Sequence, residues 1–276
     1  MTPAVAAEAL ARHGFPAVEP VAGFNPTHPT FVCGDVVVKV FAGTPRWRFA
    51  FEAERAALAL VNGAVPAPRL LADGWIEDRP YVVMSRVEGT YAEDLGDRSA
   101  LAAEVGEIVR RLHALPADGV VTVAEWDPVG ITDAARRSSL PPHLAAQAEA
   151  FVASVPVEEP VVCHADLCAM HVFVAGGHLS AVIDWGDTVA ADPHYELIQV
   201  YRDLLACDGD AFRVFLDAAA WPAYDDLPRR ALAGGIRRQA LGLVQHRTID
   251  VFMPIAERFP LGEIATLDDL AETLFA

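Results

Sequence analysis

The sequence predicts an α+β fold in two parts, and three observations support this prediction. Residues 1–87 contain short apolar runs separated by turn-forming residues, with a single long helical segment among them. Residues 88–276 are dominated by apolar residues at helical spacing. The chain has 276 residues, of which 53% are hydrophobic, so both parts can bury a core. We therefore expect a small antiparallel sheet with one helix in the first part, and a mainly helical second part.

Local patterns define the elements of the first part. The expected elements are a helix over residues 3–12, strands over 31–33 and 36–41, a helix over 46–62 and a strand over 81–84. Gly34 and Asp35 separate the first two strands, and glycine in the first place of a two-residue turn favours a hairpin. Residues 23–29 are rich in turn formers and predict a second hairpin tip. The prolines of residues 65–68 end the long helix.

The second part begins with an amphipathic helix. Leu101 and the apolar residues 4, 7, 8 and 11 positions after it lie on one helical face. Further expected elements are a helix near 143–154, strands over 161–163, 172–174 and 181–183, and helices over 195–207, 210–220, 227–245 and 266–275. The three strands surround polar loops, and a loop held by short strands is a stiff mount for functional groups.

Charge is distributed unevenly between the two parts. Residues 1–87 carry 8 basic and 8 acidic side chains, so the whole net charge of −17 lies in residues 88–276. This acidity argues against nucleic acid or an anionic membrane as a partner, and it suits a cationic small molecule. An acidic solvated surface is the alternative explanation.

The composition also indicates where the protein works. No apolar run reaches the ~18–20 residues that a membrane span requires, and residues 1–11 lack the basic segment of a secretory signal. The four cysteines do not suggest a disulfide framework in a chain of this length. We expect a cytoplasmic protein, as a monomer or weak dimer.

A single lysine stands out among the basic residues. The chain has 21 lysine and arginine residues, and Lys39 is the one lysine. Lys39 lies inside an apolar strand, which indicates a function that needs the compact charge of an ammonium group rather than the planar guanidinium of arginine. The alternative is that lysine remains at this position by chance, without a function.

Residues 161–174 hold the densest group of chemically active side chains. Cys163, His164, Cys168 and His171 are all zinc-ligand types, but the spacing offers no second cysteine pair. The histidines could instead be structural. A third interpretation is phosphoryl transfer, which needs a lysine on the phosphates, an acid that holds the lysine, a carboxylate base and metal ligands. The sequence offers these in order as Lys39, Glu54, Asp166, His171 and Asp184.

Two motifs make the chain resemble the aminoglycoside phosphotransferase family. They are His164-Ala165-Asp166-x4-His171 and Ile183-Asp184-Trp185-Gly186-Asp187. Segments 81–89, 112–115 and 192–197 are also similar to the family pattern, so the resemblance covers nearly all of residues 20–205. It implies a protein-kinase-like, two-lobed fold. Residues 1–87 would be the nucleotide-binding N-lobe, and residues 88–276 the C-lobe with the catalytic loops and the acceptor cleft.

The resemblance also implies roles for individual residues. Asp166 would be the catalytic base, and Asp184 would bind Mg²⁺ together with His171. The nucleotide-binding residues would be Lys39, Glu54, the hinge residues Ser85 and Val87, and Asn25, Thr27 and His28 of the phosphate loop. The family usually has asparagine at the position of His171, whereas macrolide phosphotransferases resemble this chain in having histidine there. The phosphate loop lacks the G-x-G-x-x-G of protein kinases.

The implied function is Mg²⁺-dependent transfer of the γ-phosphate of ATP or GTP to a hydroxyl of a small molecule. An aminoglycoside-type antibiotic suits the acidic second part, and its phosphorylation would confer resistance. Asp187, Glu196 and Asp203 are the acidic candidates for contacts with such a cationic acceptor. The alternatives are a kinase for a macrolide or for a cellular amino alcohol or sugar, and a catalytically silent nucleotide-binding protein.

Overall fold

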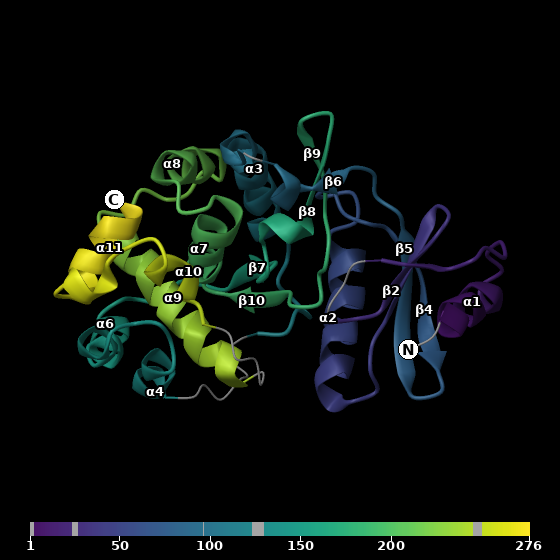
Figure 1. The fold of residues 1–276 in the computed structure, drawn as a ribbon, viewed down its shortest axis with the longest axis horizontal. Helices are drawn as coiled ribbons and strands as arrows, with labels where there is room; N and C mark the ends of the chain where they lie inside the picture. Colours follow the sequence, from purple (N-terminus) through teal and green to yellow (C-terminus); the bar gives the residue numbers. More distant parts are fainter. Residues whose placement is uncertain (1–2, 24–26, 96, 123–129, 245–249) are drawn as a thin grey trace. The chain divides into compact units, whose positions relative to one another are not determined.

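A computed structural model of the chain describes residues 3–23, 27–95, 97–122, 130–244 and 250–276. The chain divides into two compact units (Figure 1). The first consists of Met1–Thr90 and Phe173–Thr188, and the second of Tyr91–Val172 and Val189–Ala276. The segment Phe173–Thr188 therefore belongs with the N-terminal residues although it follows them by more than eighty positions.

A five-stranded antiparallel sheet is the centre of the first unit. Its strands are β1 (Val21–Ala22), β2 (Thr30–Cys33), β3 (Val36–Val40), β4 (Leu70–Ile76) and β5 (Arg79–Ser85), in the order β1-β2-β3-β5-β4. Cys33 pairs with Val36, so the hairpin turn has two residues, and Gly34 has a φ of +66°. This confirms the hairpin that the Gly34-Asp35 turn predicts, because glycine adopts positive φ without a steric penalty.

Strand β4 was not among the expected elements. It contains Asp73 and Gly74, two residue types that are rare in strands. The structure explains the glycine: a Cβ at Gly74 would lie 2.7 Å from the hydroxyl oxygen of Tyr81 on the paired strand. The space left by Gly74 accommodates the tyrosine ring, so this strand depends on a tertiary contact rather than on local propensity.

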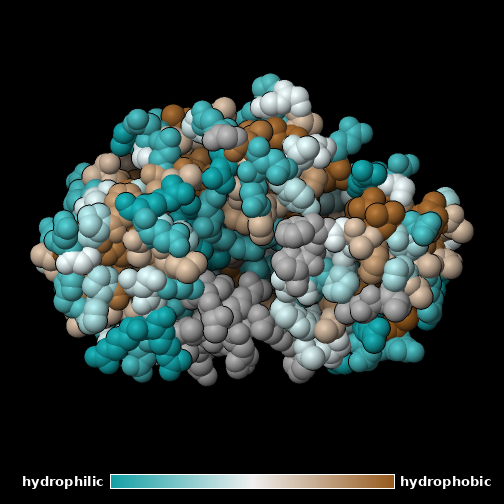
Figure 2. All heavy atoms as spheres, in the orientation of Figure 1, coloured by the Kyte–Doolittle hydropathy of each residue, from teal (hydrophilic) through white to brown (hydrophobic). Residues whose placement is uncertain are grey.

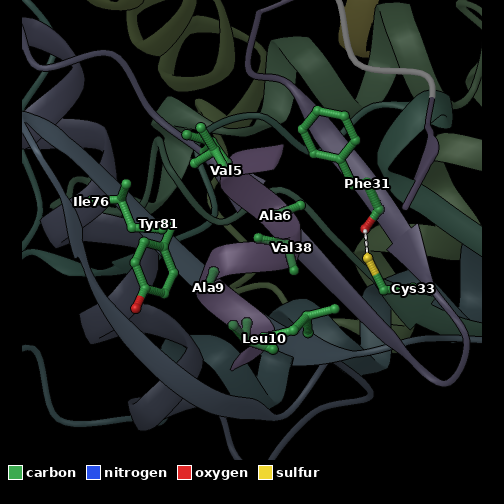
Figure 3. Packing of buried hydrophobic residues seen from close by; sticks show 11 residues of the cluster. Val5, Ala6, Ala9, Leu10, Phe31, Cys33, Val38, Ile76 and Tyr81 are labelled. Carbon is green, nitrogen blue, oxygen red and sulfur yellow. Dashed lines mark hydrogen bonds between the residues drawn. The ribbon is translucent and has the colours of Figure 1, made fainter. Parts of the chain in front are cut away.

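Helix α1 (Pro3–Arg12) covers one face of the sheet and forms a hydrophobic core with it (Figure 3). Val5, Ala6, Ala9 and Leu10 are buried against side chains of β2, β3, β4 and β5. The two alanines are fully buried, and their small side chains allow the helix to approach the sheet closely. The amphipathic helix predicted over residues 3–12 is thus confirmed.

Helix α2 (Pro45–Leu60) begins with a proline at its first turn and ends before the prolines that follow. Proline suits the first helical turn because its missing N–H has no partner there in any case. Fully or nearly fully buried side chains on this helix are Phe51, Glu54, Ala57 and Leu58.

Strand β6 (Thr90–Tyr91) and the hairpin β8 (Val172–Ala175) and β9 (His178–Val182) form a three-stranded sheet in the order β6-β8-β9.

The second unit is mainly helical. Its helices are α3 (Ala102–His113), α4 (Ile131–Arg136), α5 (Pro142–Ala145), α6 (Ala148–Ala153), α7 (Leu197–Gln199), α8 (Gly209–Ala218), α9 (Leu227–Val244), α10 (Met253–Ala256) and α11 (Leu267–Phe275). Strands β7 (Val161–Cys163) and β10 (Val189–Ala191) pair antiparallel. Helix α9 contacts α4, α6, α7 and α11, so it is the central helix of this unit (Figure 1).

Two adjacent glycines allow α9 to pack closely against the segment 193–199. A Cβ at Gly234 would lie 2.3 Å from the carbonyl oxygen of His194, and one at Gly235 would lie 2.4 Å from a methyl group of Ile198. Both distances are shorter than any real contact, so larger residues would push the segment away. These glycines therefore determine how close the polar side chains of α9 come to α7.

Two helices differ from their expected form. The helix expected over 195–207 is a 3-10 turn (Pro193–Tyr195), then α7, then a π-helical turn (Val200–Leu204). The helix expected near 143–154 is two short helices, α5 and α6. The helices expected over 101–112, 210–220, 227–245 and 266–275 are confirmed within a few residues.

Among the residues that the structure describes, no helix is both long enough and apolar enough to cross a membrane. Hydrophilic and hydrophobic residues are interspersed over the face shown in Figure 2. The large hydrophobic side chains that are exposed come from several elements, namely Val18, Val21, Leu71, Trp75, Val157, Val214 and Met253.

Candidate active site

A buried lysine in the first unit is held by two carboxylates. Lys39, near the end of β3, is 3% exposed, and Glu54 on α2 is 1% exposed. Lys39 Nζ donates to Glu54 Oε2 at 2.5 Å and to Asp184 Oδ1 at 2.7 Å. The structure therefore brings Lys39 and Glu54 together with Asp184, a motif residue that lies 145 positions after Lys39.

The two carboxylates determine the charge of the lysine. Burial opposes the charge on Lys39, but Asp184 and Glu54 outweigh burial and raise the pKa of the ammonium group. Burial is also the largest influence on Glu54. Together with Asp184 it outweighs the opposing effect of Lys39 and raises the pKa of Glu54 to about 7. Lys39 is thus a cation at neutral pH, with Asp184 beside it.

Asp184 lies in the tight loop that follows β9. Its φ of +63° is left-handed, which is uncommon for a residue other than glycine and is typical of functional loops. Trp185 anchors the loop, because its ring is fully buried and its Nε1 donates to the carbonyl oxygen of Val182 at 3.0 Å. The Asp184 side chain keeps 23% of its surface exposed. A rigid loop thus presents a carboxylate that is accessible in part.

The structure places the remaining nucleotide candidates as follows. Asn25 lies outside the described residues. Thr27 is exposed, whereas His28 is 6% exposed and packs between the rings of Phe41 and Trp47, each with its centroid 4.6 Å away. His28 therefore supports the hydrophobic core at the end of β3. Its contact with a nucleotide stays a prediction.

The predicted hinge lies at the end of β5. The Ser85 N–H donates to the carbonyl oxygen of Arg69, and the Ser85 hydroxyl accepts from the Arg69 N–H, both at 2.9 Å. Val87 lies two residues beyond the strand. Since the Ser85 N–H is already used within the sheet, Val87 is the better placed of the two for a main-chain contact with a base.

Asp166 in the second unit is held by residues from two helices. Gln199, at the end of α7, donates from Nε2 to Asp166 Oδ1 at 2.6 Å, and the Asp166 side chain is 27% exposed. Arg238 on α9 places its Nη2 3.9 Å from the same oxygen, and its guanidinium lies over the ring of Tyr195. Gln199 and Arg238 are 4% and 6% exposed. An amide donor and a nearby cation both stabilise an ionised carboxylate.

Buried polar residues beneath the loop hold its main chain. Ala165 has a φ of +62°, and its N–H donates to Glu196 Oε2 at 3.2 Å. His113 Nε2 lies 3.5 Å from the other oxygen of Glu196. Burial opposes the charge on Glu196, but His113, His164 and the Ala165 N–H outweigh it and lower the pKa of this carboxyl group. Glu196 is therefore an anion that fixes the left-handed turn before Asp166.

His171 contacts the same loop through one ring nitrogen. Its Nδ1 lies 2.7 Å from the main-chain oxygen of Asp166, which can accept a hydrogen bond but cannot donate one. Nδ1 therefore carries the proton, and in the neutral ring the lone pair is on Nε2. This tautomer is the one that would allow Nε2 to act as a metal ligand.

The candidate acceptor residues have different surroundings. Asp187 lies in the loop after β9, in the first unit. Glu196 is 2% exposed and contacts the loop before Asp166. Asp203 pairs with Arg202 at 2.9 Å, and burial outweighs that pairing and raises the pKa of Asp203. A direct contact of these three residues with an acceptor stays a prediction, and the surroundings of Glu196 are those of a supporting residue.

Comparison with known proteins relates this geometry to a family. The family model described as the phosphotransferase enzyme family (APH) matches residues 27–232, which is well over half of the chain and includes both motifs. The chain belongs to this family. It is therefore a small-molecule phosphotransferase, as its motifs predict.

Solved structures of aminoglycoside phosphotransferases have the same fold. APH(3'')-Id from Streptomyces rimosus is 22% identical with a TM-score of 0.58, and the match covers 86% of this chain and 99% of that one. APH(3')-VIII is 23% identical with a TM-score of 0.60, and the match covers 85% and 98% of the two chains. APH(4)-Ia is 18% identical with a TM-score of 0.62 over 99% and 98%. These similarities confirm the protein-kinase-like α+β fold.

The structure of this phosphotransferase also shows contacts that the sequence analysis missed. Gln199 and Arg238 lie close to Asp166, Arg202 interacts with it electrostatically, and none of the three belongs to a motif. A signal was available for Arg238, because Arg237-Arg238-Gln239 interrupts the otherwise apolar stretch from Ala231 to Val244 in the helix predicted over 227–245. A buried polar pair in such a stretch indicates a partner inside the fold.

Proposed function

We propose that this phosphotransferase transfers the γ-phosphate of ATP or GTP to a hydroxyl group of a small molecule, with an aminoglycoside-type antibiotic as the first candidate acceptor. The observation that carries the proposal is the buried contact of Lys39 with Glu54 and Asp184. Placing the ionisable pair Lys39 and Glu54 in an interior is costly unless it serves a function, because a well-packed hydrophobic cluster is often as stable.

Each charge of this triad has a task in the proposed reaction. Lys39 offers a compact cation to the phosphates, and Glu54 holds its side chain at the end of β3's apolar run. Asp184 keeps one part of its carboxylate accessible. The nucleotide would thus be bound by charges that are fixed before it arrives, which lowers the cost of ordering the site.

The donor set also fits a divalent metal ion. Mg²⁺ prefers oxygen ligands, and the partly exposed carboxylate of Asp184 supplies them, with Asp187 three residues further along the same loop. His171 is a poorer ligand for Mg²⁺, although its tautomer leaves Nε2 as the nitrogen that could bind. When bound, Mg²⁺ would neutralise charge on the phosphates.

Asp166 is the proposed general base. Its carboxylate would accept the proton of the acceptor hydroxyl as that oxygen attacks the γ-phosphate. The hydrogen bond from Gln199 fixes one carboxylate oxygen, Oδ1, and Oδ2 lies 3.4 Å from His171 Nδ1. Glu196 and the left-handed Ala165 keep the main chain of the loop in place.

The aminoglycoside proposal rests on charge and on the comparisons. The second part of the chain carries the whole net charge of −17, which would attract a cation with several ammonium groups. Among the similar structures, one is described as a complex with ADP and streptomycin, and another as a complex with AMP-PNP and hygromycin B. Phosphorylation of such a compound would confer antibiotic resistance on the host.

The test is release of nucleoside diphosphate in the presence of Mg²⁺ and either ATP or GTP. The acceptor panel contains aminoglycosides, macrolides, amino alcohols and sugars, with Asp166→Asn as the inactive control. Release that depends on an aminoglycoside and on Asp166 is the expected result. Tight nucleotide binding without release for any acceptor would instead favour a catalytically silent nucleotide-binding protein.

One observation favours a second candidate, a macrolide or another weakly charged hydroxyl compound. Arg202 and Arg238 are both buried close to Asp166, and with Asp203 and Asp166 they form a group without net charge. The immediate surroundings of the base are therefore less acidic than the unit as a whole. Salt separates the candidates: kcat/KM for a polycationic acceptor should fall as ionic strength rises, whereas that for a weakly charged one should change little.

A further inference from the structure

Three metal-binding side chains converge on the loop that follows β7. Asp166, Cys168 and His171 each place one ligand atom so that the three atoms lie within 4.8 Å of one another. His171 Nδ1 is 3.4 Å from Cys168 Sγ and 3.4 Å from Asp166 Oδ2. All three residues are half-buried and belong to the second unit. The group is therefore formed within one compact body.

The three donors and their spacing suit Zn²⁺. Thiolate, imidazole and carboxylate are the zinc ligands of proteins, whereas Mg²⁺ avoids sulfur. In a tetrahedral site with Zn–N about 2.0 Å and Zn–S about 2.3 Å, nitrogen and sulfur lie about 3.5 Å apart, and nitrogen and oxygen about 3.3 Å. The observed separations of 3.4 Å match both values. The side-chain separations are thus those of a zinc site, and binding requires His171 to turn its Nδ1 away from the Asp166 main-chain oxygen, which lies 2.7 Å from it.

This group differs from the zinc interpretation of the sequence, which included Cys163 and His164. Cys163 is fully buried, and its thiol points to the carbonyl oxygen of Ala191. His164 is 1% exposed and accepts from the Asp166 N–H through Nδ1. These two residues serve the fold, and Asp166 takes their place as the third ligand.

We propose that Asp166, Cys168 and His171 bind a zinc ion and that the bound ion inhibits the phosphotransferase. Binding converts the Cys168 thiol to a thiolate and releases one proton. The His171 proton moves from Nδ1 to Nε2, and the hydrogen bond to the Asp166 main-chain oxygen is given up. The ion occupies Asp166 Oδ2, so this oxygen can no longer accept a proton. The inhibition rests on the proposed role of Asp166 as the base, whereas the binding does not.

The binding is tested without an activity assay. Tag-free protein is titrated with Co²⁺, which substitutes for Zn²⁺ and gives a thiolate-to-metal absorption band in the near ultraviolet. We expect this band in the wild-type protein and in Cys207→Ser, and its loss in Cys168→Ser. Cys207 is a matched control because it is a second half-buried thiol of the same unit, outside the loop. Circular dichroism verifies that each variant is folded.

The affinity for Zn²⁺ follows from competition with a chromophoric chelator. Since loss of an outer partner already costs 10–100-fold in metal affinity, removal of the ligand sulfur in Cys168→Ser should cost about 100-fold or more. Absence of the cobalt band in the wild type would overturn the site. A band that survives in Cys168→Ser would also overturn it, because another thiol such as Cys163 would then be the ligand.

The inhibition is tested separately, with Zn²⁺ added to the reaction in the presence of excess Mg²⁺. We expect inhibition at the Zn²⁺ concentration that fills the site, reversal by a chelator, and a shift of about 100-fold or more in Cys168→Ser relative to its own rate without zinc. Cys207→Ser should remain as sensitive as the wild type. Zinc binding without inhibition would overturn the inhibitory role and leave the proposed transfer reaction standing.

Discussion

Lys39 in the first unit and Asp166 in the second are the central charges of two groups of candidate residues, and each unit stabilises its own charge in a different way. Lys39 is almost fully buried, and its partners Glu54 and Asp184 are both candidates that the sequence indicates. Asp166 is partly exposed, and its partners Gln199 and Arg238 belong to no motif. A cation in the interior requires countercharges, whereas an exposed base requires orientation, which a neutral amide and a distant guanidinium can supply.

The comparison predicts that the two sites fail in different ways. Loss of a group around Lys39 leaves an uncompensated charge in the interior, so the fold should suffer. Loss of a group around Asp166 leaves a carboxylate that water can still reach, so catalysis should suffer first.

Asp166→Asn should lower kcat by about 10²–10⁴, because it removes the proposed general base while keeping the size of the side chain. The measurement is steady-state release of nucleoside diphosphate with the best acceptor of the panel. Nucleotide affinity, measured by calorimetry, should change little. An unchanged kcat would contradict the role of Asp166.

Lys39→Ala should destabilise the protein by about 3–5 kcal/mol, because Glu54 and Asp184 would be left without their buried countercharge. The measurement is the free energy of unfolding in urea, with nucleotide affinity determined on the folded fraction. Lys39→Arg is the matched control, since it keeps the charge and changes the shape. If both variants unfolded like the wild type, the buried triad would not have the energetic importance proposed.

Gln199→Leu should reduce kcat about fivefold with little change in KM for the nucleotide, because Asp166 would lose the hydrogen bond that orients it. One such bond contributes about 1 kcal/mol. Gln199→Glu sharpens the test. A second carboxylate beside Asp166 should raise the pKa of the base and shift the acidic limb of the pH–rate profile upward. A loss of stability with normal kinetics would assign Gln199 a purely structural role.

Asp192→Asn should have the smallest effect, about 1 kcal/mol of stability at pH 7. Burial opposes the charge on Asp192, but hydrogen bonds from His194 and from the Glu158 N–H outweigh it and lower the pKa of this carboxyl group. A carboxyl group with a lowered pKa stabilises the fold when the pH lies above the ordinary pKa of that group. This stabilisation is lost as the pH falls through the lowered pKa of the folded protein.

The difference in unfolding free energy between wild type and Asp192→Asn should therefore shrink below about pH 4. Urea unfolding at neutral and acidic pH measures it. A difference that stays constant with pH would show that the carboxylate's charge contributes nothing. Asp192 caps the turn that leads to Glu196 and α7, so its effect should appear in the second unit.

Most elements of the fold could be predicted where local chemistry and periodicity agree. The Gly34-Asp35 hairpin and the amphipathic helices α1 and α8 have strong local signals, and all three are observed. Strand β4 and the broken helix around α7 lack such signals. Gly74 is explained by the ring of Tyr81, and the segment around α7 follows the approach of α9 at Gly234 and Gly235.

The candidate residues can be selected from the sequence, since Asp166 and Asp184 stand in two motifs of specific residue types and spacing and Lys39 is the one lysine of the chain. Only the tertiary structure decided how these residues are held. Gln199 lies 33 residues from Asp166 in the sequence, and Arg238 comes from a different helix. The physical reason is that a reactive group can be recognised from its own type and its neighbours along the chain. The groups that orient it and balance its charge need only be close in space, and packing brings them from anywhere in the sequence.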